Sequence, residues 1–244
     1  MKAVVLAGGL GTRMRPLTFA VPKTLLAVCE KPILQLIIEQ LRDAGFDEIT
    51  VATGYLAELI QAFCGDGSRF GVRVHYIHES QPLGTAGPVS LLRERVARDE
   101  FFLLMNGDIV TKLDFAAFLR HAQRRDYDLT VGYVHHKYQS PFGVLTIDER
   151  EEITGITEKP EVDYCISGGI YALKGTALDF VPDEQFFTVP DLIERLRASG
   201  RHVGAYHIRE FWRGVENPNH IVEAREALNG QLAKSMSAAS AAAK

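Results

Sequence analysis

The chain has 244 residues, of which 46% are hydrophobic and 24% are charged, and its formal net charge at pH 7 is −4. These values are ordinary for a soluble globular protein, and the length suits one α/β domain. The negative charge argues against a nucleic-acid groove, because nucleic-acid-binding domains usually carry a basic surface. No apolar run approaches the length of a membrane span, and Met1-Lys2 lead directly into a strand, so we expect a cytoplasmic location and no membrane partner.

Apolar, strand-like runs alternate along the chain with segments of helical periodicity. The predicted strands are 3–7, 48–53, 72–77, 101–106, 129–134 and 167–173, and the predicted helices are 32–44, 56–63, 85–97, 114–125, 189–198 and 218–229. This alternation predicts βαβ units and a mostly parallel central sheet buried on both faces, which is a three-layer, Rossmann-like α/β fold. The domain is expected to end at about residue 230, because the Ala/Ser-rich tail 231–244 has no amphipathic face to bury and is expected to be disordered or frayed.

A glycine-rich turn follows the first predicted strand and contains Gly8, Gly9 and Gly11. Glycine has no Cβ, so backbone N–H groups in such a turn can approach an anion closely. Arg13 and Lys23 add positive charge beside it. The pattern therefore predicts a binding site for a phosphate chain.

Two common phosphate-binding motifs do not fit this turn. A P-loop requires Gly, four residues and then Gly-Lys-Ser/Thr, and that run is absent. A dinucleotide fingerprint requires a third small residue where this chain has Met14. Neither a kinase-like site nor a nicotinamide site is therefore favoured.

The predicted central strand 101–106 ends at Asn106, and Asp108 follows it closely. Ligands of open α/β sheets bind beyond the carboxyl ends of the strands, so Asp108 and the glycine turn are expected in one cleft. A carboxylate at the end of a buried strand is costly unless it is paired or binds a cation, and Mg²⁺ takes one or two carboxylates together with substrate phosphates. Asp108 is therefore predicted to bind Mg²⁺; a helix cap is the alternative role.

The cysteines and histidines suggest no further metal site. Cys29, Cys64 and Cys165 are odd in number and widely separated, so we expect reduced, mostly buried thiols and neither a disulfide nor a zinc site. His75 and His78 fall on opposite faces of a predicted strand, so they do not form a pair of ligands.

The run from Ala7 to Thr18, with Pro22-Lys23 and Lys31-Pro32 after it, resembles the signature of the sugar-1-phosphate nucleotidylyltransferases, also called NDP-sugar pyrophosphorylases. The resemblance covers about residues 1–228 in the expected order, and it is strongest to mannose-1-phosphate guanylyltransferase-like members. The other matching segments are Leu83-Gly84-Thr85-Ala86-Gly87, Asn106-Gly107-Asp108, Pro141-Phe142-Gly143-Val144 and Glu158-Lys159-Pro160.

The resemblance implies a nucleotidyltransferase domain over 1–230 that joins a sugar-1-phosphate to a nucleoside triphosphate, with Mg²⁺ as cofactor. The products are an NDP-sugar and pyrophosphate, and a β-rich subregion at about 129–175 would form the sugar-binding half of the cleft. The implied catalytic residues are Arg13, Lys23 and Asp108. The implied nucleotide-binding residues are Leu6, Gly8, Gly9, Gly11, Thr12, Arg13, Glu79, Gly84 and Thr85, and the implied sugar-phosphate-binding residues are Asn106, Gly143, Glu158, Lys159 and Ser167.

Glu79 bears on the choice of base. Relatives that use uridine or thymidine nucleotides tend to have Gln at this position, which suits a pyrimidine N3–H flanked by carbonyl groups. A carboxylate only accepts hydrogen bonds, and guanine offers N1–H and N2–H₂ side by side. Glu79 therefore favours GTP, with mannose-1-phosphate or a related sugar phosphate as partner, and a thymidylyl- or uridylyltransferase is the alternative.

The chain departs from the family pattern at Gly214, where relatives usually have a second metal-binding Asp. Glu216 lies on the same side of an extended segment and is one candidate replacement; water around the metal is another. The third alternative is a non-catalytic regulator that binds nucleotide-sugars. Because Arg13, Lys23 and Asp108 are all present, an active enzyme is favoured. Family members often form dimers or tetramers, so a homo-oligomer is compatible with the resemblance.

Overall fold

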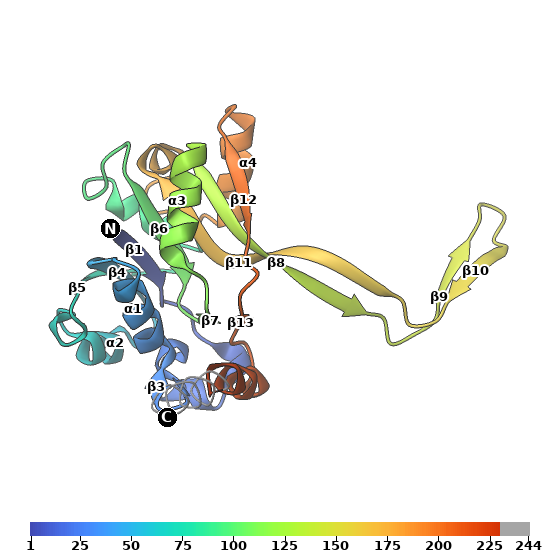
Figure 1. Cartoon of the computed structure of the whole chain (residues 1–244), viewed down its shortest axis with the longest axis horizontal. Coiled ribbons are helices and arrows are strands. Elements are labelled where there is room, and N and C mark those ends of the chain that lie inside the picture. Colours follow the sequence, from blue (N-terminus) through green and yellow to red (C-terminus); the bar gives the residue numbers. More distant parts are fainter. Residues whose placement is uncertain (230–244) are drawn as a thin grey trace, which may run out of the picture.

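The computed structural model describes residues 1–229, which form an α/β body around a seven-stranded sheet (Figure 1). The strands lie in the order β12-β8-β11-β6-β1-β4-β5. Their bounds are β1 Lys2–Leu6, β4 Glu48–Thr53, β5 Arg73–His78, β6 Phe101–Asn106, β8 Leu129–Gln139, β11 Glu161–Lys174 and β12 Val203–His207. Short two-stranded sheets pair β2 (Ala27–Val28) with β3 (Lys31–Pro32), β7 (Ile109–Thr111) with β13 (Trp212–Gly214), and β9 (Val144–Ile147) with β10 (Ile153–Thr157). The predicted tail 231–244 lies outside the described residues.

The central sheet is mostly parallel, as the alternating pattern predicts. β1 runs parallel to β4 and β6, β4 to β5, and β8 to β12, whereas β11 is antiparallel to both β6 and β8. Parallel strands need crossover connections, and the helices in those connections cover the sheet. The Rossmann-like fold class is therefore confirmed.

Helices cover the sheet on both faces. One apolar cluster joins Ala3 and Val5 of β1 to α1 (Ile33–Asp43), α2 (Ala57–Cys64) and α3 (Phe115–Arg125). The other cluster joins Val4 to α4 (Val189–Ala198). Successive side chains of a strand point to opposite faces, so β1 contributes to both layers of the core. The chain is again helical over 218–229, and none of the described helices has the length and apolar character needed to cross a membrane.

The predicted helix 85–97 is wrong. The structure has only a short 3₁₀ helix, η5 (Gly87–Leu92), in this segment. Pro88 lacks a backbone N–H, and the N–H groups of Ala86 and Gly87 both donate to the Phe187 carbonyl at 2.9 Å. The segment is held by this tertiary contact, which helical periodicity does not reveal.

β8 and β11 continue past the sheet as a two-stranded ribbon that carries the β9–β10 hairpin and projects away from the body (Figure 1). We call residues 135–165 the arm; none of them is buried. The predicted strands 129–134 and 167–173 are therefore too short, because the cross-strand pairing runs on to Gln139 and Glu161. The section 129–175 does not fold back as a wall of the cleft of its own chain.

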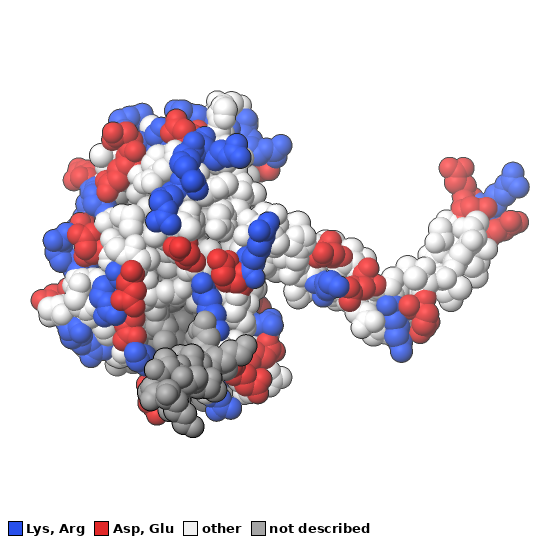
Figure 2. Space-filling model, in the orientation of Figure 1, with Lys and Arg blue, Asp and Glu red and all other residues white. Residues whose placement is uncertain are grey.

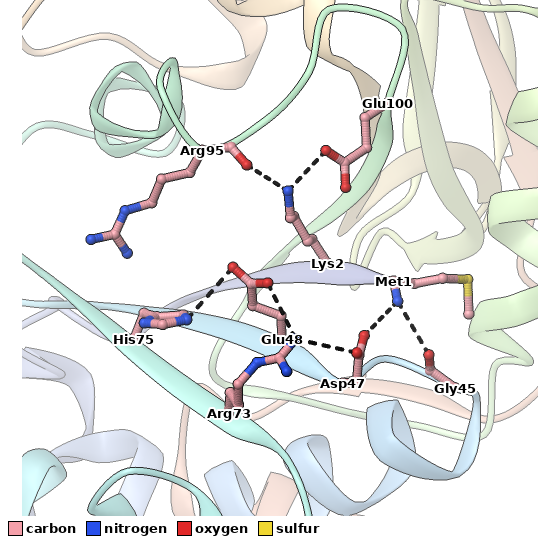
Figure 3. A network of polar contacts seen from close by, with 9 residues as sticks. All are labelled: Met1, Lys2, Gly45, Asp47, Glu48, Arg73, His75, Arg95 and Glu100. Atoms are coloured by element: carbon pink, nitrogen blue, oxygen red, sulfur yellow. Dashed lines mark hydrogen bonds and ion pairs between the residues drawn. The ribbon is translucent and has the colours of Figure 1, made fainter.

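A polar network links the amino ends of β1, β4 and β5 (Figure 3). Lys2 Nζ lies 2.9 Å from Glu100 Oε2, and the amino terminus lies 2.7 Å from Asp47 Oδ1. Ion pairs in contact with solvent contribute about 0–1 kcal/mol each, so this network adds little to the stability of the fold. The glycine turn and Asp108 lie at the opposite, carboxyl edge.

Two of the three cysteines are exposed, so the expectation of mostly buried thiols is wrong. Cys29 occupies the turn between β2 and β3 with φ 57°, and Cys165 lies on the arm. Only Cys64, at the end of α2, is buried, and burial raises the pKa of its thiol to about 11.

Candidate functional site

A cavity of about 720 Å³ opens at the carboxyl edge of the sheet, beyond β1, β4, β5 and β6. The predicted site residues that line it are Leu6, Gly8, Gly9, Gly11, Thr12, Arg13, Lys23, Glu79, Gly84, Thr85, Asn106, Asp108 and Glu216. These residues come from five separated segments of the chain. The structure therefore brings together the glycine turn, the cations and the carboxylates in one cleft.

Two glycines of the turn are closely surrounded, and at Gly11 the positive φ also favours glycine. A Cβ at Gly8 would lie 2.6 Å from Oε1 of Glu79, and a Cβ at Gly11, which has φ +59°, would lie 2.9 Å from Cγ2 of Thr18. The Thr18 hydroxyl donates to the Gly11 carbonyl at 2.8 Å and fixes the turn. At Gly9 a Cβ would meet nothing within 4 Å, so the backbone there borders open space. Backbone N–H groups in such a turn are available to an anion.

An ion pair joins the two sides of the cleft floor: Nζ of Lys23, at the start of the 3₁₀ helix η3 (Lys23–Leu25), contacts Oδ2 of Asp108. The two side chains are only 16% and 23% exposed, so each would be costly to leave unpaired. Gly107 brings Asp108 close to the end of β1. Its N–H donates to the Leu6 carbonyl at 2.8 Å, and a Cβ at this position would lie 2.6 Å from the same oxygen.

A second ion pair lies at the rim of the cleft, where Nη1 of Arg13 lies 2.5 Å from Oε2 of Glu216. The β7–β13 pairing explains this position. Gly214 faces Ile109, and the N–H of Val215 donates to the Asp108 carbonyl at 2.8 Å. Glu216 follows directly and lines the cleft.

Gly214 itself does not line the cavity, and a Cβ there would lie 3.6 Å from the Trp212 ring, which is ordinary contact. Within residues 1–229 no group of three or more His, Cys, Asp or Glu side chains is arranged to hold a metal ion. The carboxylates that border the cleft beside the glycine turn are Asp108, Glu216 and Glu79.

Glu79 lies just past the end of β5, with its N–H donating to the Thr53 carbonyl at 2.8 Å. Its Oε2 accepts the Leu83 N–H at 3.0 Å, whereas Oε1 lies against Gly8. Burial raises the pKa of this carboxyl, while the Leu83 hydrogen bond and nearby His78 oppose the rise. The loop after it is fixed by Thr85, whose hydroxyl accepts the Val189 N–H at 2.9 Å.

Most of the residues expected to bind the sugar phosphate lie outside the cleft. Of the five, Asn106 lines it. Gly143, Glu158 and Lys159 lie on the exposed arm, where a Cβ at Gly143 would lie 3.0 Å from Oε2 of Glu158. Ser167 is exposed at the base of the arm, with its hydroxyl 2.9 Å from the Tyr171 hydroxyl.

Several residues that line the cleft were not predicted from the sequence, including Gly54, Tyr55 and His78. Gly54 and Tyr55 directly follow β4, so the rule that places ligands beyond strand carboxyl ends was a sufficient signal for them. The Tyr55 hydroxyl donates to the Phe19 carbonyl at 3.2 Å. This hydrogen bond links the end of β4 to the segment that follows the glycine turn.

A protein-family model described as "Nucleotidyl transferase" matches residues 2–231. The chain is 32% identical over 229 residues to "Probable mannose-1-phosphate guanylyltransferase 1" of Oryza sativa subsp. japonica, covering 91% of this chain and 63% of that protein. It is 31% identical to "UTP--glucose-1-phosphate uridylyltransferase" of Synechocystis sp., covering 87% and 59%. The chain thus spans about three fifths of the length of these relatives.

Among solved structures, HddC from Yersinia pseudotuberculosis superposes with a TM-score of 0.72 at 26% identity, covering 93% of this chain and 99% of that one. A second structure of HddC, complexed with GMP-PN, gives a TM-score of 0.71 at 25% identity.

Proposed function

The chain belongs to the nucleotidyl transferase family, and from this premise we propose that it joins GTP and a sugar-1-phosphate to give a GDP-sugar and pyrophosphate. The observation that carries the proposal is the cleft in which the glycine turn, Arg13, Lys23 and Asp108 meet. We take mannose-1-phosphate as the first sugar phosphate to test, followed by glucosamine-1-phosphate and a manno-heptose phosphate.

The residues suit a transfer between two anions. An oxygen of the sugar phosphate attacks the α-phosphorus of GTP, and the bond from that phosphorus to the bridging oxygen of the β-phosphate breaks, releasing pyrophosphate. The attacking oxygen is already ionised, so no general base is needed. Charge cancellation and in-line positioning carry the rate instead, and Lys23 and Arg13 supply positive charge beside the glycine turn.

Asp108 and Glu216 are the residues we propose to hold Mg²⁺. Their chemistry fits this ion, because Mg²⁺ prefers one or two carboxylates and completes its shell with water and phosphate oxygens. In the structure each carboxylate pairs with a cation, Asp108 with Lys23 and Glu216 with Arg13, so Mg²⁺ would share the carboxylate oxygens with these side chains or displace them. When bound, the ion would neutralise charge on the reacting phosphates. The ion pair with Lys23 holds Asp108 in position on the cleft floor.

Two observations support guanine over a pyrimidine. Oε1 of Glu79 lies against the glycine turn, where it can accept hydrogen bonds from guanine N1–H or N2–H₂. The relatives include proteins named as mannose-1-phosphate guanylyltransferases, and HddC is described in complex with GMP-PN. Because another relative is named as a uridylyltransferase, UTP is the alternative nucleotide substrate to test.

The experiment follows pyrophosphate release with each of GTP, UTP, dTTP and ATP, combined with a panel of sugar-1-phosphates. We expect release only when both substrates and Mg²⁺ are present, and fastest with GTP. Lys23→Ala should lower turnover by about 10²- to 10³-fold, as loss of a group that stabilises transition-state charge does. Lys31→Ala is the matched control, because Lys31 pairs with Glu39 outside the cleft.

A second candidate function is a nucleotide-sugar-binding regulator, which Gly214 favours because a metal carboxylate usual in relatives is absent. It predicts no pyrophosphate release with any pair of substrates but measurable GDP-sugar binding by calorimetry. Release with GTP would exclude it.

A further inference from the structure

The outer part of the arm exposes several large apolar side chains. Phe142 is 74% exposed, Ile156 68% and Ile153 65%, and Val144, Leu145 and Ile147 are between 46% and 57% exposed. Figure 2 shows an uncharged stretch on the outer part of the arm, between charged groups at its bend and at its far end. A two-stranded ribbon is marginally stable alone in water, so this surface needs a partner.

The cleft mouth of the body is the complementary surface. Leu10 lines the cavity and is 52% exposed, and Leu17 and Phe19, on the neighbouring 3₁₀ helix η2 (Leu17–Phe19), are 48% and 60% exposed. These residues lie beside the site that the proposed function assigns to the nucleotide. Covering them with the arm would bury apolar surface on both sides.

The arm cannot reach the cleft of its own chain with its pairing intact. β8 and β11 are paired from Tyr133 and Ser167 out to Gln139 and Glu161, and this ribbon leads away from the body (Figure 1). Turning back would require these pairs to break or bend sharply. From Val134 to Ile147 the chain spans at most about 40 Å at ~3.3 Å per residue. That length is similar to the diameter of a globular body of about 200 residues, so the arm can cross a neighbouring copy.

We propose that two copies of this chain exchange their arms, so that the arm of each copy packs on the cleft mouth of the other. The arm then brings Glu158 and Lys159 to the sugar side of the partner's cleft, which lacks these residues in a single chain. This assignment of Glu158 and Lys159 rests on the proposed function. In a two-fold symmetric dimer each arm packs on the cleft of the other copy. No arm and no cleft is then left to bind a third copy.

The first experiment tests the sharing of sites by mixing two variants with different tags. Lys23→Ala damages the cleft and Lys159→Ala damages the arm, so each alone should lose most activity. If arms are exchanged, a co-expressed mixed dimer contains one intact site out of two. In an equal, random mixture about half of the dimers are mixed, so about a quarter of wild-type activity is recovered. Mixing Lys23→Ala with Asp108→Asn is the control, and it should recover nothing.

A mixture of Lys23→Ala and Lys159→Ala that recovers nothing, while the wild type is active in the same assay, would overturn the exchange. An inactive wild type would instead count against the proposed function, and the exchange is then decided by mass. Light scattering should give twice the chain mass of 27.1 kDa for the wild type. A variant with 140–160 replaced by Asn-Gly should give the mass of a single chain. Its circular dichroism should lose only the contribution of the β9–β10 hairpin, because none of the deleted residues is buried in the body. A wild-type protein at the mass of one chain, or a deletion variant that stays dimeric, contradicts the proposal.

Discussion

Replacing Glu79 by Gln tests the proposal that this side chain selects the base of the nucleotide. In the structure the two carboxylate oxygens have different surroundings: Oε2 accepts the Leu83 N–H at 3.0 Å and Oε1 lies against Gly8. An amide has one acceptor and one donor end. In Glu79→Gln the carbonyl oxygen is needed by Leu83, so the NH₂ group turns towards the turn and would face the donors of guanine.

The magnitude follows from the bond that is lost. A hydrogen bond to a charged group contributes about 1.5–3 kcal/mol, which corresponds to ~10- to 150-fold in a rate or binding ratio. We therefore expect kcat/KM for GTP relative to UTP to fall by about 10- to 100-fold in Glu79→Gln. The assay is pyrophosphate release with each nucleotide at a fixed sugar phosphate, with Glu58→Gln on the exposed face of α2 as the matched control.

The pH dependence gives an independent readout of the same group. Burial raises the pKa of Glu79, so below that raised pKa the carboxyl is protonated and the KM for GTP should rise; in Glu79→Gln this rise is absent. Between the ordinary and the raised pKa the folded state binds more protons than the unfolded state. The unfolding free energy of the wild type should therefore fall as pH rises through this window, and the variant should lack that fall. An unchanged GTP to UTP ratio in a folded Glu79→Gln protein would refute the reasoning.

Three further predictions test other parts of the account. Gly214→Asp should raise turnover at limiting Mg²⁺, since a side chain fits there at 3.6 Å from Trp212; no change in the Mg²⁺ titration would show that this position does not serve the ion. Gly107→Ala should destabilise the protein by about 1–3 kcal/mol in urea unfolding, because its Cβ would overlap the Leu6 carbonyl, whereas Gly9→Ala should be neutral; equal midpoints would contradict the packing. Cys64→Ser should leave the number of fast-reacting thiols of the folded protein unchanged, since burial raises the pKa of that thiol to about 11; loss of one fast thiol would contradict its burial.

The cleft was predictable because its parts follow from one topological rule. Leu6, Asn106 and Glu79 each lie at or just past the carboxyl end of a parallel strand, so the strand pattern alone places them at one edge. Glu216 was predictable only as a candidate, because its position depends on the short β7–β13 pairing that brings Val215 to Asp108. That pairing has no periodic signal in the sequence.

The arm and η5 were not predictable for a different reason. Residues 135–139 and 161–165 lie in a section that the sequence predicts only as β-rich, and the long β8–β11 register is what makes them a ribbon. The sequence at 85–97 has helical periodicity. However, the N–H groups of Ala86 and Gly87, at the start of this segment, both donate to the Phe187 carbonyl. In both places long-range backbone pairing overrides the local pattern, and long-range pairing is what a sequence pattern does not contain.

A crystal structure with bound GDP-mannose would test the central claim most directly. We expect the diphosphate to lie between the glycine turn and Lys23, within hydrogen-bonding reach of Arg13 and on the same side as Asp108, with guanine against Glu79. A nucleotide-sugar bound at another surface, with this cleft empty at saturating ligand, would contradict the account.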